Sequence, residues 1–540
     1  MAVQLLCVTA GVVVLLLLRH FVTLLVGRTR LPLPPGPTPL PLIGNAHQAP
    51  KETPWLQYSA WSKLYGPIFH LSMAGQPVVV LNTLESAQAL LSKRGADYSE
   101  RPRAIVVGEL ATKGLHLLLR RYDAAYKLHQ RMQSPVLNPR AANAYRPLQE
   151  LESRQLLLDL LTSSDCAADR GTDFNRWFER ANASTIYALI YGYRLKTGFE
   201  QALVHAKIVQ VEFIKRFQPG AHVVEVLPFL NYLPVPLAPW KREAEALWDL
   251  ERNLHMGNME RGFENPGWNF TKHMKGSSEA KNMSPVEFAF DLGILADAAL
   301  DTTTMSIGWF VVAWLTQNEG FVAKAQQLID EVVGQDRLPQ FEDQPRLTYV
   351  TAIIHEVLRW RPVVPGGVPH KFGGEKDDEY HNYRIPAGSI VVANHWAICR
   401  EESVFGKDPD AFLPERWIPE KDDTTTQVKD GLKDMHLSGF GFGRRVCTGQ
   451  HIARKMLFIV ISRLLWAFNV EPAMDENGKK ITIDPMAVST GFAIRPQKTI
   501  AIFRPRSRKV RKLIETECST HSADLVEILN RAAGERSAKG

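Results

Sequence analysis

Cysteine is scarce in this chain: only five of the 540 residues are cysteine, and they are scattered. An odd, scattered set excludes a disulfide framework as the basis of the fold and fits a reducing compartment. Internal repeats and long low-complexity blocks are also lacking, so composition alone marks no domain boundary. The sequence has no nucleic-acid recognition motif either, and nucleic acid is therefore not an expected partner.

Apolar residues are abundant by contrast, at 45% of the chain, against 22% charged residues. A chain of this length can bury a large core, and length alone suggests about two to four domains. The formal net charge of +7 and the pI near 9.0 suit an anionic membrane surface or an acidic protein partner.

The N-terminus carries a long apolar run. Residues 5–26 are long enough to cross a bilayer, although Arg19 and His20 interrupt them. A secretory signal would carry its positive charge before the apolar core, whereas Arg28 and Arg30 follow it here. We therefore expect residues 1–30 to be an uncleaved transmembrane anchor, with the following chain in the cytoplasm. A cleaved signal peptide is the alternative.

A proline-rich segment follows at residues 31–45. Successive prolines favour a stiff, extended chain, so we expect a hinge or an ordinary spacer that ends near residue 45. Residues 506–540 are a basic extension, for which the simplest expectation is a mobile tail near anionic lipid, with a short amphipathic helix at residues 523–532.

Periodicity and turn signals place the regular elements of the large domain. Helices are expected at residues 54–64, 120–132, 175–195, 200–217, 350–360 and 450–468, and strands at residues 67–71, 78–81 and 389–394. A proline-punctuated apolar loop occupies residues 219–234. Glycosylation sequons occur at Asn182, Asn269 and Asn282, and on a cytoplasmic domain they should stay unmodified.

A further helix is expected from residue 285 to about residue 316. Ser284 is its cap, Pro285 its first residue, and Glu287 would close a capping box. The helix is apolar on all sides, which is typical of a buried helix, and it would be about 45 Å long. Inside it, Asp301 places an acid beside the hydroxyl of Thr302. In a buried helix such polar groups are unfavourable unless they have a bonding partner or a function. Alternatively, the hydroxyl bonds back to a carbonyl one turn earlier.

A glycine-rich turn at residues 440–449 presents Cys447 just before a helical pattern. The glycines let the backbone turn tightly and pass close to something flat. The free N–H groups at the start of the helix favour a thiolate. A metal held by one thiolate in such a turn suggests a haem iron with a cysteine axial ligand, and Arg445 would face a haem propionate. A buried structural cysteine is the alternative.

The pattern Phe-x-x-Gly-x-Arg-x-Cys-x-Gly resembles the cysteine loop of the cytochrome P450 haem-thiolate monooxygenases. Its five fixed positions all match, at Phe440, Gly443, Arg445, Cys447 and Gly449. Three other segments resemble the family in the family's order, namely residues 298–303 (Ala-Ala-Leu-Asp-Thr-Thr, with Ala299 where Gly is usual), Glu356-x-x-Arg359, and Pro414-Glu415-Arg416-Trp417.

The resemblance covers about residues 31–505 and implies that residues 46–505 form one catalytic domain. The implied fold is mainly α, with a large helical domain and a small β-sheet region. It implies haem b (iron protoporphyrin IX) as the cofactor, with Cys447 as the axial iron ligand, favouring O–O cleavage. Thr302, with Asp301, would hold the bound oxygen and relay protons to it. The resemblance assigns further residues to haem contacts, namely Arg445, Phe440, Arg101 and His370, and to a buried structural network, namely Glu356, Arg359 and Arg416.

One helix departs from the family. Where the family usually has Trp, and Arg four residues later, this chain has Tyr126 and Gln130. Arg131, Lys127 or His129 are candidates to compensate for the lost propionate contacts. The other reading of these basic residues is a solvated helix face.

The function that the resemblance implies is insertion of oxygen from O2 into a hydrophobic small molecule, with electrons from NADPH. The expected partners are NADPH-cytochrome P450 reductase and, as a further candidate, cytochrome b5. The expected place is the endoplasmic reticulum membrane, crossed once, with the catalytic domain in the cytosol. The chain looks most like fungal microsomal members of secondary-metabolite pathways, and xenobiotic detoxification is an alternative role.

Two alternatives come from other functional classes. A haem-thiolate isomerase or peroxide-driven peroxygenase needs no reductase, and a non-catalytic haem sensor binds haem without turnover. Neither of them requires the acid and hydroxyl at Asp301 and Thr302, so this pair favours reductive oxygen activation.

Overall fold

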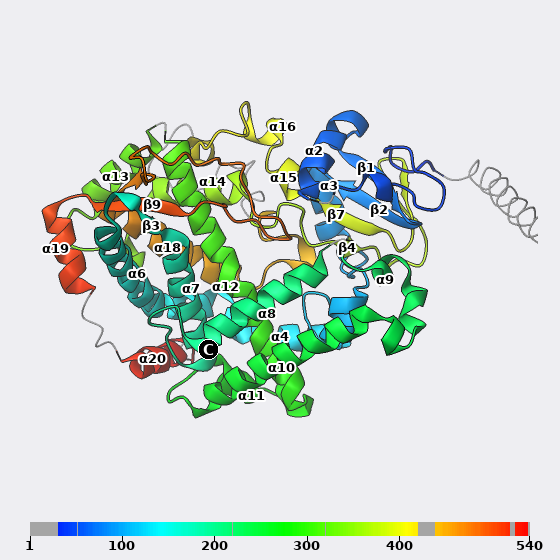
Figure 1. The fold of residues 1–540 in the computed structure, drawn as a ribbon, viewed down its shortest axis with the longest axis horizontal. Helices are drawn as coiled ribbons and strands as arrows, with labels where there is room; N and C mark the ends of the chain where they lie inside the picture. The colour runs from blue at the N-terminus through cyan, green and yellow to red at the C-terminus, as the bar shows by residue number, and fades with distance from the viewer. Residues whose placement is uncertain are drawn as a thin grey trace, which may run out of the picture.

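The computed structural model describes residues 31–50, 52–218, 220–318, 320–418, 438–518 and 524–537. The expected membrane anchor at residues 1–30 lies outside the described residues. Helices fill the left and centre of the molecule in Figure 1, and a small sheet region gathers at the upper right. The expectation of a mainly α chain with a small β region is therefore confirmed.

The longer helices of the large domain are α2 (Pro54–Tyr65), α4 (Ala124–Leu137), α6 (Arg146–Ala167), α7 (Phe174–Tyr191), α8 (Gln201–Phe217), α10 (Pro239–Glu264), α12 (Pro285–Thr316), α13 (Phe321–Val332), α14 (Thr348–Trp360) and α18 (Gln450–Ala467). Shorter helices connect them, namely α3 (Leu84–Ala87), α5 (Pro139–Ala144), α9 (Val223–Val226), α11 (Phe270–Lys275), α15 (His395–Ile398) and α16 (Glu402–Phe405). The helix expected at residues 120–132 begins only at Ala124, because the Asp123 side chain accepts a hydrogen bond from the Tyr126 amide and caps it there.

The largest sheet has four strands in the order β1 (Ile68–Met73), β2 (Gln76–Leu81), β7 (Ile390–Ala393) and β4 (His370–Lys371). The β1–β2 hairpin turns at Ala74 and Gly75, both with positive φ, and β2 runs parallel to β7. The two smaller sheets are β3 (Thr172–Asp173), β9 (Ile500–Pro505) and β8 (Phe468–Pro472), and the pair β5 (Asp378–Tyr380) and β6 (Tyr383–Ile385).

The proline-rich segment lies against this sheet region. The Pro35 carbonyl accepts a hydrogen bond from the His70 amide (2.9 Å), and the Pro32 carbonyl accepts one from the Arg384 amide (2.8 Å). A Cβ at Gly36 would lie 2.0 Å from the His70 carbonyl oxygen, so only glycine allows this close approach. The segment is thus attached to the large domain and is not a free spacer.

Helix α12 runs through the centre of the fold and contacts α7, α10, α14 and α18. It is long and apolar enough to cross a membrane, but most of it is buried inside the protein, as a core helix would be. The Ser284 hydroxyl accepts the Glu287 amide hydrogen as expected. The reciprocal half of the capping box does not appear, because the Glu287 carboxylate lies 3.0 Å from the His129 ring instead.

The polar network expected around Glu356 forms inside the core. Two nitrogens of Arg359 donate to the two oxygens of the Glu356 carboxylate, both at 2.7 Å, and both side chains are buried. The Arg416 guanidinium lies 3.6 Å from the same carboxylate. The remaining hydrogen-bonding capacity is used as well: Glu356 accepts from the Trp417 indole, and Arg359 donates to three backbone carbonyls. The network ties α14 to the segment before the cysteine loop.

The C-terminal extension is folded where the structure describes it. Helix α19 (Arg508–Glu517) buries Val510 and Ile514 in the main core, and Arg506 forms an ion pair with Asp330. Helix α20 (Leu525–Ser537) buries Leu529 in a second core cluster. The expectation of a short helix here is confirmed, whereas the expectation of a mobile tail is wrong, because both helices have apolar faces that pack on the domain.

Arg359→Met should lower the free energy of unfolding by about 3–5 kcal/mol, because it leaves the Glu356 carboxylate buried without its partner. Chemical denaturation followed by circular dichroism measures this loss. The matched control is Arg511→Met, which removes the half-exposed ion pair with Asp165 and should cost less than about 1 kcal/mol. Equal effects of the two substitutions would contradict a special role for the buried network.

Candidate active site

The cysteine loop is held by its own backbone. The Cys447 amide donates to the Phe440 carbonyl at 2.8 Å, and Gly443 has a φ of 57°. A Cβ at Gly443 would lie 2.0 Å from the Leu91 carbonyl oxygen, so the loop can approach this neighbouring turn only with glycine. This geometry places Cys447 directly before the first turn of α18.

The Cys447 side chain is surrounded by protein, yet a large part of its surface is accessible. Its accessible side therefore faces a space inside the molecule. Burial raises the pKa of the thiol, and the amides of Gly449 and Gln450 at the start of α18 oppose this rise. The helix start therefore favours the thiolate as expected, whereas burial opposes it. A bound metal cation would favour the thiolate further.

Helix α12 offers a second accessible surface in the interior. Ala298 and Thr302 lie one turn apart on the same face and are accessible, whereas Leu300 and Asp301 between them are buried. Helix α18, which begins just after Cys447, packs against α12. We infer that the accessible surface at Cys447 and the one at Ala298 and Thr302 face each other across one internal space, which we call the chamber.

The Thr302 hydroxyl donates to the Ala298 carbonyl at 3.1 Å, so the back-bonded arrangement considered from the sequence is present. It does not occupy the side chain fully, because a hydroxyl oxygen keeps two lone pairs for acceptance. Nearby, the buried Asn182 amide on α7 donates to the carbonyls of Ala299 (2.5 Å) and Leu300 (3.0 Å). No sequence pattern signals this contact, because Asn182 is recognisable in the sequence only as a sequon.

Asp301 points to a different partner from Thr302. Its carboxylate lies 2.5 Å from the Arg495 guanidinium, which also lies 3.3 Å from Glu179. Burial raises the pKa of Asp301, and the charge of Arg495 partly opposes the rise. The structure therefore places Asp301 in an ion-pair network that the sequence did not reveal, because Arg495 is almost 200 residues away along the chain.

Three of the expected haem contacts come together beside the cysteine loop. Arg101 donates to the carbonyls of Val368 and Pro369 at 3.1 and 2.7 Å, and His370 contacts the Tyr98 carbonyl at 2.7 Å. Arg445 donates to the Ser99 carbonyl at 2.8 Å and to the Arg120 carbonyl at 2.6 Å. Strand β4 presents His370 here because it pairs with β7 in the sheet.

This cluster has an excess of buried positive charge. Within the described chain, no carboxylate lies within 4 Å of Arg101 or Arg445. Burial, and then the charge of Arg445, lower the pKa of Arg101 to about 9. Burial, followed by Arg101, also lowers the pKa of His370 to about 3, so this ring is neutral at pH 7. An acidic group of a ligand would balance the two guanidinium ions.

Tyr126 is part of the same cluster. The Arg445 guanidinium lies 3.9 Å from the centre of its ring, a cation–π contact between two largely buried groups. Phe440 lies at the edge of the main core, with the Arg454 guanidinium over its ring. Of the two residues that depart from the family on α4, Tyr126 is thus in place beside Arg445, whereas no described contact involves Gln130.

These observations fit haem. An interior thiol faces the chamber, and an unbalanced pair of guanidinium groups lies beside its loop, as suits a metal centre with an acidic edge. The described residues offer no cluster of three or more His, Cys, Asp or Glu side chains that could hold a bare metal ion. A single cysteine ligand is what an iron already held by a macrocycle requires.

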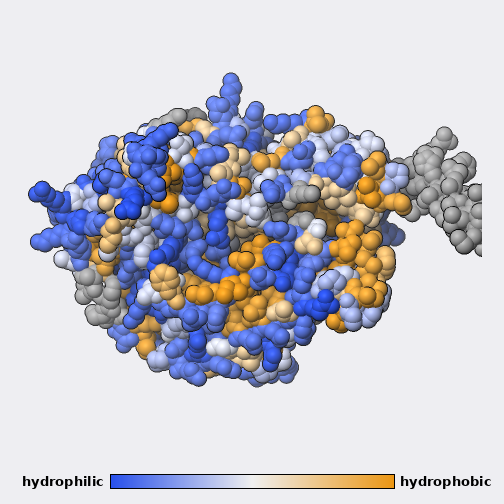
Figure 2. Space-filling view, viewed as in Figure 1, coloured by the Kyte–Doolittle hydropathy of each residue, from blue (hydrophilic) through white to orange (hydrophobic). Residues whose placement is uncertain are grey.

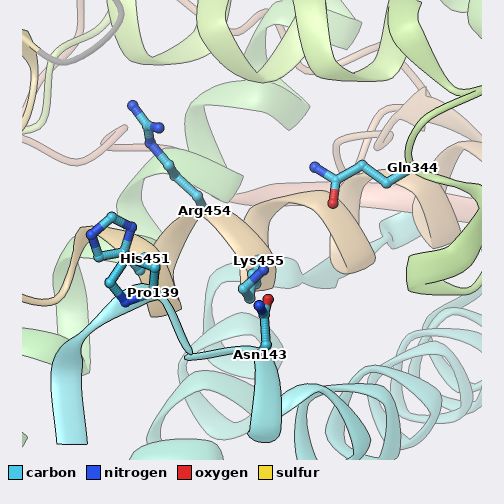
Figure 3. Close-up of a pocket in the computed structure, with 6 residues that line it drawn as sticks. All are labelled: Pro139, Asn143, Gln344, His451, Arg454 and Lys455. Carbon is cyan, nitrogen blue, oxygen red and sulfur yellow. The ribbon is translucent and has the colours of Figure 1, made fainter. Parts of the chain in front are cut away.

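A separate basic pocket opens near the first turns of α18. It has a volume of about 300 Å³ and is lined by Pro139, Asn143, Gln344, His451, Arg454 and Lys455. In Figure 3, Arg454 points upward from α18, whereas His451 is drawn over Pro139 and Lys455 just above Asn143. Burial and the charge of Arg146 lower the pKa of Lys455 to about 8. Carboxylates are not among the lining residues, so the pocket is suited to a negatively charged group.

Comparison with known proteins agrees with the geometry. The sequence profile of the family described as Cytochrome P450 matches residues 34–503. The chain is 38% identical to Cytochrome P450 monooxygenase aneD of Aspergillus aculeatus, covering 93% of both chains. It is 36% identical to Cytochrome P450 monooxygenase FrzL of Cladobotryum sp, again over 93% of both. It is 35% identical to Cytochrome P450 monooxygenase 58 of Postia placenta, over 90% of this chain and 91% of the relative.

Proposed function

The chain belongs to the cytochrome P450 family of haem-thiolate monooxygenases, and on this premise we propose which of its residues perform the reaction. The enzyme incorporates oxygen into a small molecule and takes its electrons from a redox partner. The haem, when bound, supplies the oxidising chemistry at an iron that a cysteine thiolate ligates. The protein binds and orients the substrate, excludes water and delivers protons.

Cys447 is the proposed axial ligand of the haem iron. The observation that carries this proposal is the position of its thiol: it is enclosed by protein, accessible from the chamber, and two residues from the unbalanced charge of Arg445. Arg445, Arg101 and His370 are the proposed propionate contacts. Tyr126 supports Arg445 through its ring.

Thr302 and Asp301 divide the handling of protons between them. The Thr302 hydroxyl faces the chamber and is the proposed group that hydrogen-bonds oxygen and passes a proton to it. Asp301 lies on an adjacent face of α12 and is bound to Arg495. Arg495, which is partly exposed, holds Asp301 in place, and the Asp301 carboxylate is the group that would take up and release the proton.

The proposed electron donor is NADPH-cytochrome P450 reductase, with cytochrome b5 as a further candidate. The basic pocket formed by His451, Arg454 and Lys455 supports docking of an acidic partner surface. Helix α18 connects this pocket to Cys447, because it begins three residues after the cysteine. A partner bound there would lie on the thiol side of the proposed haem site.

The proposed location of the protein is the endoplasmic reticulum membrane, with the catalytic domain in the cytosol. The segment after α8 exposes several large apolar side chains, namely Val223, Val226, Leu227, Phe229, Tyr232, Val235 and Leu237. Leu40, Leu42 and Ile43, just after the expected anchor, are exposed as well. Figure 2 shows apolar surface in the middle and at the right of this face. Surfaces of this kind support contact with lipid.

The biological role proposed is the oxidation of an apolar intermediate in fungal secondary metabolism. Its support is the similarity to monooxygenases of three fungal genera and the aromatic side chains of Phe213, Phe217 and Phe492, which pack on one another between α8 and the chain before β9.

Cys447→Ala should abolish the red-shifted Soret band that a thiolate-ligated haem gives in the reduced, CO-bound protein. The loss follows because alanine offers the iron no thiolate. The control is Cys166→Ala, which removes another accessible cysteine, on α6, and should keep the band. Persistence of the band in Cys447→Ala would contradict the proposal that Cys447 ligates the haem iron.

Thr302→Val should preserve haem content and substrate binding, because valine has nearly the same shape. Product formed per NADPH should fall roughly tenfold or more, with electrons diverted to peroxide or water, because the hydroxyl that directs the proton is gone. Thr304→Val is the matched control: its hydroxyl bonds back to Leu300 and is buried away from the chamber. An unchanged product yield in Thr302→Val would show a purely structural threonine.

The cytosolic placement can be tested with a new sequon. Asn182 and Asn269 are unsuitable reporters, because both side chains are buried and hydrogen-bonded in the fold. Lys479→Thr creates a sequon that begins at Asn477, in an exposed turn at Gly478. We expect this asparagine to stay unmodified in intact cells, and its glycosylation would place the domain in the lumen.

A further inference from the structure

Asp297 is an acid that the proposed reaction does not use. It precedes the chamber-facing Ala298 on α12, and 26% of its side chain is accessible although protein surrounds it. Like Cys447 and Thr302, it therefore faces internal space. The His255 ring on α10 is its titratable neighbour, with 3.6 Å between Nε2 and the Asp297 carboxylate.

A second acid lies against the same place. Glu251, one turn before His255 on α10, is only 3% exposed, and its Oε2 accepts no hydrogen bond from the described part of the chain. Burial, and then the charge of Asp297, raise the pKa of Glu251 well above its usual value. A buried, unsatisfied carboxylate oxygen is costly, and a ligand that donates to it would remove the cost.

Among the residues that the structure describes, no lysine or arginine lies within 4 Å of either carboxylate. The Arg261 guanidinium on α10 instead hydrogen-bonds the Tyr193 hydroxyl, and its charge partly opposes the rise in the pKa of Tyr187 that burial causes. Burial and His116 lower the pKa of His255 to about 3, so its ring is neutral. Burial likewise lowers the pKa of His116 to about 4, and its Nδ1 has no partner among the described residues.

The titratable groups that interact with Asp297 come from α10 and α7. His255 on α10 lies 3.6 Å from its carboxylate. Burial and the charge of Asp297 raise the pKa values of Glu251 on α10 and of Tyr187 and Tyr191 on α7. None of them is positively charged at pH 7, and burial raises the pKa of Asp297 itself to about 7. The surroundings are otherwise apolar and aromatic, since His255 packs on Phe290 and His116 stacks on Phe213.

We propose that Asp297, backed by Glu251, recognises a positively charged nitrogen of the substrate, and that the apolar remainder of the substrate extends toward Ala298 and Thr302. This inference rests on the proposed function, because it assigns the chamber to the substrate of a monooxygenase. The substrate class is therefore an apolar amine, and not a neutral hydrocarbon or an acid. Its cation would supply the charge that α7, α10 and α12 do not provide.

The probes for the test are two ligands of one shape. One is phenylpropyl trimethylammonium, whose quaternary nitrogen cannot ligate iron, and the other is its neutral analogue with carbon in place of nitrogen. Calorimetry on the full-length holoenzyme gives both affinities. An apolar chamber without a counter-charge would prefer the neutral compound. We expect the ammonium compound to bind at least about tenfold more tightly, as a charge-assisted contact would allow.

The pH dependence has a definite sign. The ammonium compound needs ionised Asp297, so its affinity should rise as the pH increases from about 6 to about 8, through the pKa of about 7. The neutral compound should show no such rise. Asp297→Asn should remove both the preference and its pH dependence, and Glu251→Gln should reduce the preference. Glu260 is an exposed acid on α10, the helix that carries Glu251. Glu260→Gln is therefore the matched control and should change neither the preference for the ammonium compound nor its pH dependence.

The outcome is separable from that of the proposed function. Each variant is first checked for the red-shifted CO band, which reports the thiolate-ligated haem. If the band is missing in the unsubstituted enzyme, the proposed function fails. If the band is present, then equal affinities, tighter binding of the neutral probe, binding of neither probe, or an unchanged preference in Asp297→Asn overturns the amine proposal alone.

Discussion

The constraint on which this structure depends is positive charge buried without a counter-charge. Arg101 and Arg445 lie side by side in the interior. Among the described contacts, Arg101 donates only to backbone carbonyls, and Arg445 donates to backbone carbonyls and contacts the Tyr126 side chain, so neither guanidinium pairs with a carboxylate. Burying such a pair is unfavourable in the protein alone. The cost falls when an acidic cofactor binds, and by mass action the cofactor then stabilises the fold. The stability of the fold and the binding of the cofactor are thus linked, because the cofactor supplies the negative charge that these two guanidinium groups lack.

The Glu356 network shows the opposite design. Its carboxylate and the Arg359 guanidinium satisfy each other, and backbone carbonyls and the Trp417 indole complete the set. The polar groups of this network therefore need no ligand, and the network holds α14 against the segment before the cysteine loop. The contrast separates scaffold from site: polar groups of the scaffold are satisfied internally, whereas those around the chamber are left unbalanced, positive near Cys447 and acidic near Asp297.

Two of the residues where the chain departs from its family contact a residue from another part of the sequence. Tyr126 stands where a tryptophan is usual, and its ring lies against Arg445. Ala299 replaces the usual glycine in α12, and the Asn182 amide bonds to its carbonyl from α7. In both cases the contacting partner comes from an element distant in the sequence, so the motif alone could not identify it.

The sequence by itself determined the family, the mainly α fold, the bounds of most helices to within a few residues, and the candidates Cys447, Thr302, Glu356 and Arg359. It could do so because helix caps, periodicity and the cysteine loop are local patterns. Only the tertiary structure decided that burial opposes the helix start at Cys447 and that Arg495 binds Asp301. It also decided that the C-terminal helices pack on the domain and that the charge of Asp297 on α12 acts on Glu251 on α10. These properties depend on desolvation and on partners far apart along the chain, which no local pattern encodes.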